Sequence, residues 1–214
     1  MKKNILLVGA LALVFSTMFL NGCKKDDTTA PVVTVTGSAS KTVEINGTYN
    51  EEGATATDDE DGTISTTQSG SVDVTTEGTY TLTYSATDAA GNTGSATRTV
   101  TVVIVRNSYV GTYNVTGTLD GTTETPYGTP IVASGTEANK IIVSNFANVS
   151  GSNVFATVSG HSVTIPSQTY SDGTYTYTVV GSGSINNKAE VMSLNWTASV
   201  GSVSVVGVET YTKQ

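Results

Sequence analysis

The sequence predicts an all-β protein with two β domains in series. The chain has 214 residues and is rich in Thr, Ser, Val, Tyr and Gly, while good helix formers are scarce after residue 23. A shift in charge divides the chain, because residues 26–103 hold 12 acidic and two basic side chains whereas residues 106–214 hold six and four. We therefore expect one domain over residues 31–105 and a second over residues 106–214.

The first 22 residues have the pattern of an export signal. Lys2 and Lys3 precede an almost unbroken apolar run over residues 5–20. This run is shorter than the roughly 20 residues that cross a bilayer as a helix, so it favours a signal peptide over residues 1–22 rather than a membrane anchor. The segment Leu20–Cys23 (LNGC) resembles the lipobox of bacterial lipoproteins. That resemblance implies cleavage before Cys23 and diacylation of its sulfur, a palmitate-bearing anchor; an ordinary signal peptide with an incidental cysteine is the alternative.

Residues 23–30 form a polar tether with a second targeting pattern. The tetrapeptide over residues 24–27 (KKDD) resembles the export signal of Bacteroidota lipoproteins, which routes them to the outside of the outer membrane. We expect a protein held in the outer membrane through the lipid on Cys23 and facing the cell exterior; a merely solvated tether is the alternative. Cys23 is the only cysteine, so its lipidation leaves no thiol for a disulfide within the chain or for catalysis.

Alternating apolar and polar residues predict half-buried strands in the first domain. Tyr80, Leu82, Tyr84 and Ala86 fall on one face of a segment whose other face is Thr and Ser, and residues 99–105 alternate in the same way. Turn-forming pairs separate these segments: Asn46-Gly47, Asp61-Gly62, Glu77-Gly78 and Gly91-Asn92. About six or seven short strands at this spacing suggest a β-sandwich.

Four motifs in this half occur in the order of a bacterial Ig-like domain. They are Ala30–Val35 (APVVTV), Gly53–Asp58 (GATATD), Gly78–Tyr84 (GTYTLTY) and Ala86–Asn92 (ATDAAGN). Together they resemble the Ig-like family that recurs in bacterial surface lipoproteins, adhesins and a pesticidal crystal protein. The resemblance covers roughly residues 28–104 and implies an Ig-like β-sandwich that acts as a spacer or adhesive module without enzymatic activity.

The second domain has the pattern of successive hairpins. Candidate strands run over residues 110–118, 140–145, 154–159, 162–165, 174–180, 191–198 and 202–211. Tight reversals are predicted at Gly160-His161 and Asn186-Asn187. Strands joined by short turns favour a meander that closes into a small antiparallel β-barrel, with a second β-sandwich as the alternative. The segments Tyr109–Tyr113 (YVGTY) and Ile165–Gln168 (IPSQ) resemble lipocalin-like C-terminal domains of Bacteroidota lipoproteins, which implies the same barrel.

The densest group of acidic residues marks a candidate cation site. Asp58, Asp59 and Asp61 lie in one turn and Asp88 lies in a later one, and Ca²⁺ takes six to eight oxygen ligands, often from carboxylates. The spacing lacks the regular pattern of an EF-hand loop, and a solvated turn that protects the end of a sheet is the alternative. Asp88 also suits a purely structural turn with the following Gly-Asn pair. Ca²⁺ is the one cofactor that the sequence suggests.

No catalytic group is marked out by the sequence. His161 is the only histidine and falls in a predicted turn, so neither a histidine-based triad nor a zinc site is indicated. The acidic residues of the second domain are scattered, whereas a glycosidase needs two acids about 5–10 Å apart. The excess of 18 acidic over ten basic residues argues against nucleic acid as a partner. We therefore expect no enzymatic activity, and an envelope hydrolase is the least favoured class.

The aromatic residues of the second domain are the candidate ligand-binding groups. Tyr175 and Tyr177 share a strand face, Trp196 is the only tryptophan, and Tyr127 lies in the segment 126–130, which is expected to be an exposed loop. Such rings suit sugar stacking and protein interfaces, and they also suit the core of a small barrel. We expect a surface lipoprotein whose second domain binds a glycan or an outer-membrane partner protein; a purely structural or adhesive protein is the alternative.

Overall fold

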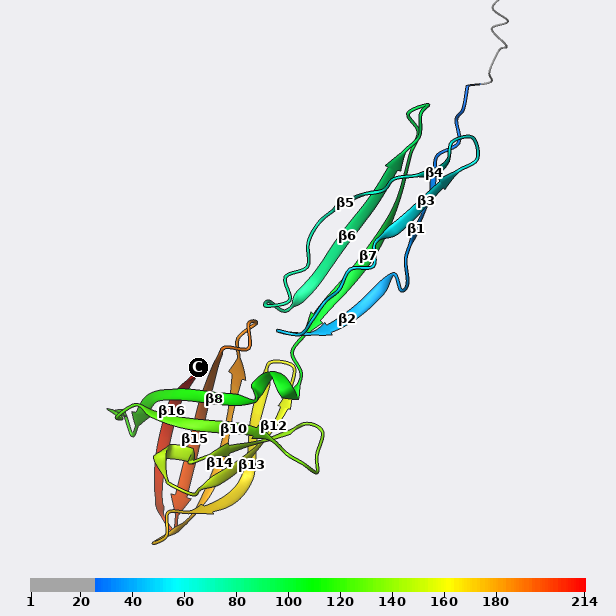
Figure 1. The fold of residues 1–214 in the computed structure, drawn as a ribbon. Coiled ribbons are helices and arrows are strands. Elements are labelled where there is room, and N and C mark those ends of the chain that lie inside the picture. Colours follow the sequence, from blue (N-terminus) through cyan, green and yellow to red (C-terminus); the bar gives the residue numbers. More distant parts are fainter. Residues whose placement is uncertain (1–25) are drawn as a thin grey trace, which may run out of the picture.

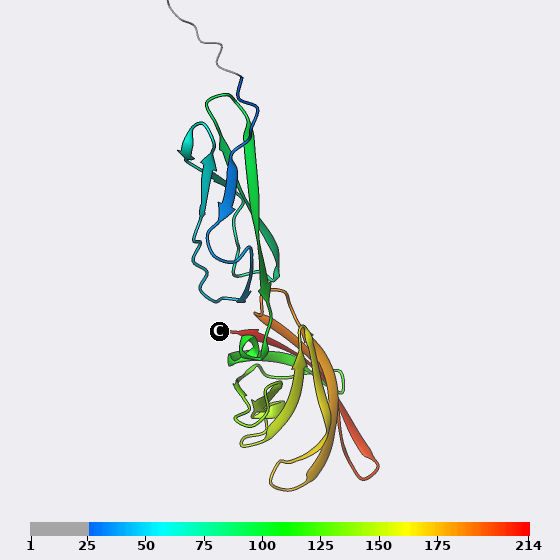
Figure 2. The same ribbon diagram turned by 90° about the vertical axis from the view of Figure 1, so that its right-hand side faces the viewer.

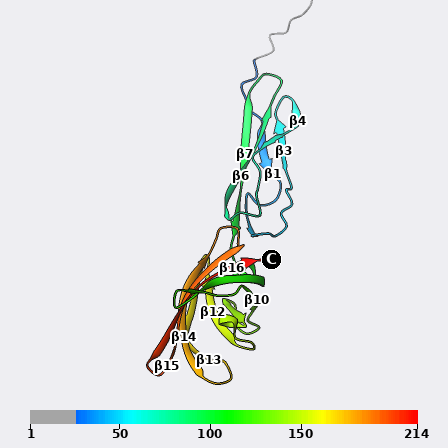
Figure 3. The same cartoon turned by 90° about the vertical axis from the view of Figure 1, so that its left-hand side faces the viewer.

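The computed structural model describes residues 26–214, which form two bodies of β-sheet arranged end to end (Figure 1). The predicted signal peptide and Cys23 lie outside the described residues. Within residues 26–214 nearly all of the regular secondary structure is strand, as predicted, and the helices there are two 3-10 turns, η1 (Arg106–Tyr109) and η2 (Phe146–Asn148). Neither of these has the length or apolar character to span a bilayer. The end-to-end arrangement is also visible from the two sides (Figure 2 and Figure 3).

The first body, here called the sandwich, has two sheets, as predicted for an Ig-like fold. One sheet contains β1 (Val32–Val35), β3 (Ala54–Asp58) and β4 (Gly62–Ile64). The other contains β2 (Ser40–Glu44), β7 (Thr93–Val103), β6 (Gly78–Thr87) and β5 (Thr67–Ser69), with β2 parallel to β7. The predicted faces of β6 and β7 are confirmed, because their alternating residues form the core: Leu82, Tyr84, Ala86, Val100 and Val102.

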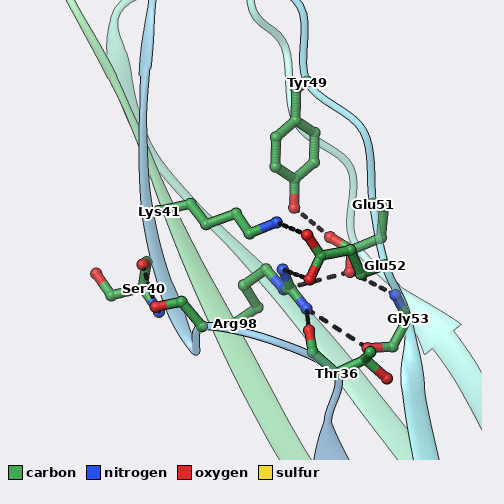
Figure 4. Close-up of polar contacts among 9 residues, drawn as sticks. Thr36, Ser40, Lys41, Tyr49, Glu51, Glu52, Gly53 and Arg98 are labelled. Carbon is green, nitrogen blue, oxygen red and sulfur yellow. Dashed lines mark hydrogen bonds and ion pairs between the residues drawn. The ribbon is translucent and has the colours of Figure 1, made fainter.

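A buried arginine links the two sheets of the sandwich (Figure 4). The side chain of Arg98 on β7 is fully buried, and its Nε lies 3.2 Å from a carboxylate oxygen of Glu51. Its guanidinium also donates a hydrogen bond to the carbonyl oxygen of Thr36, beyond the end of β1. Burial opposes the charge of Glu51, but hydrogen bonds from Tyr49 and from the N–H of Gly53, together with the positive charge of Arg98, lower its pKa to about 2.

Eight antiparallel strands close into a barrel in the second body, so the alternative of a second sandwich is wrong. The strands are β8 (Gly111–Leu119), β10 (Tyr127–Ala133), β11 (Lys140–Ser144), β12 (Asn153–Ser159), β13 (Ser162–Ser171), β14 (Thr176–Ile185), β15 (Val191–Val200) and β16 (Val203–Lys213). They pair in chain order from β10 to β16, and β8 closes the ring by pairing with both β16 and β10. The short β9 (Thr122–Thr123) forms a hairpin with β8 at the rim.

The proline-containing segment is part of the barrel wall, against the prediction of an exposed loop. β10 pairs with β8 from Tyr127 to Ile131, whereas its pairing with β11 begins only at Ile131. Pro130 therefore lies where β10 has a neighbour on one side, which is the kind of strand position that tolerates a missing N–H donor.

The sandwich meets the barrel through turns at one end of the barrel. The backbone N–H of Glu77 donates to the carbonyl of Asn187 at 2.8 Å. His161, in the predicted turn after β12, donates from Nδ1 to the carbonyl of Ile185 at 2.7 Å, and its Nε2 contacts the carboxylate of Glu77. These contacts define which end of the barrel faces the sandwich, and the opposite end points away from it.

Replacing Arg98 with Leu is expected to destabilise the sandwich by about 3 kcal/mol, because the Glu51 carboxylate loses its buried cation. Lys41→Ala is the matched control, since Lys41 pairs with Glu52 at 2.6 Å at the surface, where an ion pair contributes less than about 1 kcal/mol. Chemical denaturation of both variants measures the two losses. Equal losses would show that the buried pair is no more important than the surface pair.

The contact between His161 and Glu77 is expected to weaken as the pH rises. The Ile185 carbonyl and the Glu77 carboxylate favour the protonated ring, which raises the pKa of His161 above its ordinary value. A raised pKa means that the stabilisation is complete below the ordinary value of about 6.5 and is lost as the pH rises through the folded-state pKa. His161→Gln should therefore lower the melting temperature at about pH 6 and change it little at about pH 9. An equal decrease at both pH values would contradict this role.

Candidate functional site

A pocket opens at the end of the barrel that points away from the sandwich. β13 starts at the turn beside the sandwich and ends, ten residues later, next to the pocket. The cavity encloses about 150 Å³ between β8, β13, β14, β15 and β16 and the segment around η2. Its walls are mostly apolar and aromatic with one acid: Leu119, Ala147, Val149, Tyr170, Asp172, Tyr177, Trp196, Ala198 and Val205. An apolar cavity with few polar groups is the usual form of a small-molecule site.

Five aromatic rings form a continuous ladder along this pocket. In the interior, the ring centroids of Trp196 and Phe146 are 5.0 Å apart, and Phe146 meets Tyr170 edge-on at 5.8 Å. Tyr170 stacks on Tyr177 at 5.3 Å with an interplanar angle of 21°, and Tyr177 meets Tyr175 edge-on at 6.4 Å. Because Trp196 is 3% exposed and Tyr175 is 56% exposed, the ladder runs from the core to solvent. The pocket thus has a rigid apolar wall with polar hydroxyl tips.

Trp196 fits inside the barrel because glycines face it from both neighbouring strands. Gly207 on β16 and Gly181 on β14 lie directly opposite Trp196 in the strand pairing. A Cβ on Gly207 would lie 2.1 Å from the indole ring, and one on Gly181 would lie 2.8 Å from the Trp196 Cβ. Any larger residue at Gly207 would therefore displace the indole from the pocket wall.

A buried carboxylate anchors the inner end of the ring ladder. Glu209 on β16 is 4% exposed and accepts hydrogen bonds from Tyr127 Oη at 2.6 Å, Trp196 Nε1 at 2.8 Å and Tyr211 Oη at 2.8 Å. Burial and the nearby charge of Glu209 raise the pKa of Tyr211 well above its ordinary value, so this hydroxyl remains a donor. Within residues 26–214 no basic side chain forms an ion pair with Glu209. Its charge is thus balanced by ring donors alone.

A second carboxylate lies in the pocket wall itself. Asp172 follows β13 in a tight turn, and its Oδ1 accepts the N–H groups of Thr174 at 2.8 Å and Tyr175 at 2.7 Å. Its Oδ2 accepts the hydroxyl of Tyr177 at 3.0 Å. The N–H groups of Tyr175 and Thr174 lower the pKa of Asp172, so it carries a negative charge at neutral pH. The turn therefore presents a fixed anion beside the stacked tyrosines.

The structure places the predicted aromatic residues in and around this pocket. Tyr177 and Trp196 line it, and Tyr175 lies against Tyr177 on its solvent side. Tyr127 differs from the expectation, because it is half-buried in β10 and its hydroxyl is bound to Glu209. It supports Trp196 through that carboxylate and does not line the cavity.

The sequence prediction of binding residues lacks Tyr170, Asp172 and Glu209. The Asp172-Gly173 pair is a recognisable turn signal, and it predicts a polar side chain close to the strand end that contains Tyr170. Glu209 has no such local signal, since two of its three partners lie on other strands.

Three carboxylates gather at the end of the sandwich that is remote from the barrel. Asp27, Asp58 and Asp88 each place a carboxylate oxygen within 4.8 Å of the others. Oδ1 of Asp58 accepts the N–H groups of Glu60 and Asp61, whereas its Oδ2 is buried and has no hydrogen-bond partner. A buried carboxylate oxygen without a partner is costly, and a bound cation would compensate it.

This group shares two members with the predicted cation site. The structure brings Asp58 and Asp88 together, adds Asp27 from the tether and leaves Asp59 exposed outside the group. Asp61 instead accepts a backbone N–H from the β6–β7 turn at 2.6 Å. Calcium–oxygen distances of about 2.3–2.6 Å place two ligand oxygens at most about 5 Å apart. The observed separations therefore fit a shared Ca²⁺ ion.

Residues 33–102 match the family model described as bacterial surface protein, Ig-like domain. No curated protein matches the chain. The crystal structure of the lipoprotein BT2262 from Bacteroides thetaiotaomicron is 19% identical over 86% of this chain and 100% of that one, with a TM-score of 0.35. The structure of CBM51-2 in complex with GlcNAc and INT domains from Clostridium perfringens ZmpB is 16% identical over 84% of this chain, with a TM-score of 0.29, and this chain spans 43% of its length.

The family match is the specific finding among these similarities. Both TM-scores lie below 0.5, so neither structural likeness carries a conclusion about function. The match extends from β1 to β7 and includes most of the sequence from the first motif to the last. Residues 33–102 therefore match the bacterial surface protein Ig-like family, in agreement with the resemblance of their motifs.

Proposed function

We propose that the chain is a non-enzymatic cell-surface lipoprotein whose Ig-like domain carries a β-barrel that binds a glycan. The family match over residues 33–102 supports the surface location. The lipobox that ends at Cys23 and the charged tetrapeptide after it support a lipid anchor in the outer membrane, facing the cell exterior. In this proposal the sandwich is the spacer and the barrel is the recognition domain.

The observation that carries the proposal is the aromatic pocket at the outer end of the barrel. The apolar C–H face of a sugar packs well on aromatic rings, and its hydroxyls need polar partners at the edge. The stacked pair of Tyr170 and Tyr177 supplies the aromatic rings, and the carboxylate of Asp172 supplies a polar partner for the sugar hydroxyls. The cavity of about 150 Å³ is smaller than the roughly 300–1,000 Å³ of sites for drug-sized ligands, so we expect it to take one ring of a longer glycan.

The position of the pocket also suits a surface receptor. The tether enters the sandwich next to the β6–β7 turn, where Asn92 donates to the carbonyl of Asp27 at 3.2 Å. The opposite end of β6 begins beside the barrel, at the contact between Glu77 and His161. The pocket lies at the far end of the barrel, so the sandwich and the barrel, which stand end to end (Figure 1), separate it from the tether at Asp27.

The state of the acidic groups supports binding rather than hydrolysis. Glycoside hydrolysis uses one carboxyl group as a proton donor and a second as a base or nucleophile. Glu209 already accepts three hydrogen bonds in the barrel interior, and Asp172 is held by the backbone of its own turn. His161 is engaged with Glu77 at the other end of the barrel. A proton-transfer step would have to break the hydrogen bonds that hold these groups in place.

Tyr177→Ala is expected to weaken glycan binding at least about tenfold, because it removes a ring that stacks on the ligand. Phe155→Ala is the matched control, since Phe155 is 41% exposed on the outer face of β12, away from the pocket. Calorimetry against a panel of polysaccharides measures both, with circular dichroism to show that each variant is folded. If the unaltered chain binds none of the panel, a structural or protein-binding role replaces this proposal.

A second proposal is that Asp27, Asp58 and Asp88 bind Ca²⁺. It is favoured by the buried Oδ2 of Asp58, which has no hydrogen-bond partner and lies close to the other two carboxylates. Because Asp27 belongs to the tether, an ion held there would fasten the tether to the sandwich. The barrel would then be carried on a stiffer connection to the membrane.

Millimolar Ca²⁺ is expected to raise the melting temperature of the sandwich by a few degrees, because a ligand that binds only the folded state stabilises it. Asp58→Asn should abolish the shift, since it removes the charge of the unpaired oxygen. Asp59→Asn is the control, because Asp59 lies in the same turn and outside the group. Differential scanning calorimetry with and without Ca²⁺ measures the shifts. Equal shifts in both variants would place the ion elsewhere, and no shift in the unaltered chain would remove the proposal.

A further inference from the structure

We propose that the barrel pocket selects an amino sugar that carries a free ammonium group. This inference rests on the proposed glycan-binding role and specifies which chemical group of the glycan the pocket recognises. It follows from the charges at the pocket. Both charged groups are carboxylates, and the groups that donate hydrogen bonds to them are all neutral.

The charge of the pocket is carried by two carboxylates. Asp172 is the one charged residue among those that line the cavity, and Glu209 lies directly behind Trp196, to which it is hydrogen-bonded at 2.8 Å. Neither acid forms an ion pair within the described residues 26–214, and no lysine, arginine or histidine lines the cavity. The donors to both acids are backbone N–H groups, an indole and tyrosine hydroxyls.

These two charges act on the same part of the pocket. Burial, and then the nearby groups Tyr177, Asp172 and Glu209, raise the pKa of Tyr170 to about 12. Tyr170 stacks on Tyr177, which donates to Asp172. On its other side Phe146 joins it to Trp196, which donates to Glu209, so Tyr170 lies between the two carboxylates. Asp172 is exposed at the mouth of the pocket, where solvent screens its charge, whereas Glu209 is buried, where attraction to a cation is stronger.

A cationic ligand group would use each of these features. An ammonium group placed beside Asp172 would neutralise a charge that has only neutral partners, and the face of an adjacent tyrosine ring also attracts a cation. A neutral sugar can only donate hydroxyl hydrogen bonds to the carboxylate and lacks the attraction between opposite charges. Residues 106–214 hold six acidic and four basic side chains, so the barrel itself has a small negative net charge.

The size and shape of the pocket favour a sugar amine over a flexible alkylamine. The stacked pair of Tyr170 and Tyr177 presents flat rings, and the cavity of about 150 Å³ has room for one ring of similar size. The exposed ring of Tyr175, which extends the ladder outward, offers a surface for the next unit of the chain.

The test compares three oligosaccharides of equal length at about pH 6: a glucosamine oligomer, its N-acetylated form and a neutral glucose oligomer. Residues 26–214 contain every described strand and serve as the protein. We expect the glucosamine oligomer to bind at least about tenfold more tightly than the other two. Asp172→Asn should remove most of this preference, because Asn keeps an acceptor for the N–H groups of the turn and loses the charge that attracts the ammonium group. The preference should also decrease with added salt, since ions screen the attraction.

The outcomes separate this inference from the proposal beneath it. Equal binding of all three oligomers, or a preference that persists in Asp172→Asn, would overturn the amine selectivity and leave glycan binding intact. Binding of none of the three or of any other polysaccharide would overturn both. Tyr177→Ala distinguishes pocket binding from general attraction to the acidic surface, because it keeps every charge: loss of the glucosamine oligomer in that variant supports the pocket, and unchanged binding contradicts it.

Discussion

The barrel depends on one buried charge. The carboxylate of Glu209 lies inside the ring of strands, where an ion without partners would cost several kcal/mol. Its donors come from β10 and β16, the two strands that flank the closing strand β8, and from β15, which pairs with β16. A slip of one residue in any of these strands would turn a donor to the outer face, so the hydrogen bonds define the register on both sides of the closure. Apolar packing alone would specify that register less strictly, because it is not directional.

The same carboxylate sets the inner wall of the pocket. The bond to Trp196 Nε1 fixes the indole, Phe146 packs on the indole, and Tyr170 and Tyr177 follow in sequence along the ladder. A site built on such a chain of contacts is preorganised, so little side-chain freedom remains to be lost when a ligand binds. The closure of the fold and the shape of the site are therefore two results of one set of contacts.

Local patterns predicted most of the fold, because period-two burial is a property of neighbouring residues. The alternation over residues 80–86 identified the core face of β6. The turn at Gly160-His161 was predicted from a signal that is also local, a glycine between two strand patterns. Closure of the barrel is not local, since β8 joins strands far apart in sequence and the prolines near Tyr127 signal a turn. The site was predictable only in part: Tyr127 and Trp196 are separated from Glu209 by 82 and 13 positions, and no spacing rule connects them.

The placement of the tether and the pocket at opposite ends of the molecule follows from the connectivity. β7 ends at Val103, where the chain passes into the barrel. β8 starts beside this junction and ends at Leu119 in the pocket wall. In an antiparallel barrel every second connection lies at the same end. The junction end receives the tight turn at Gly160-His161, which docks against the sandwich, while the pocket end receives η2 and the turn at Asp172. A short turn is suited to rigid docking and a longer connection to lining a cavity, so the order of strands alone separates the two roles.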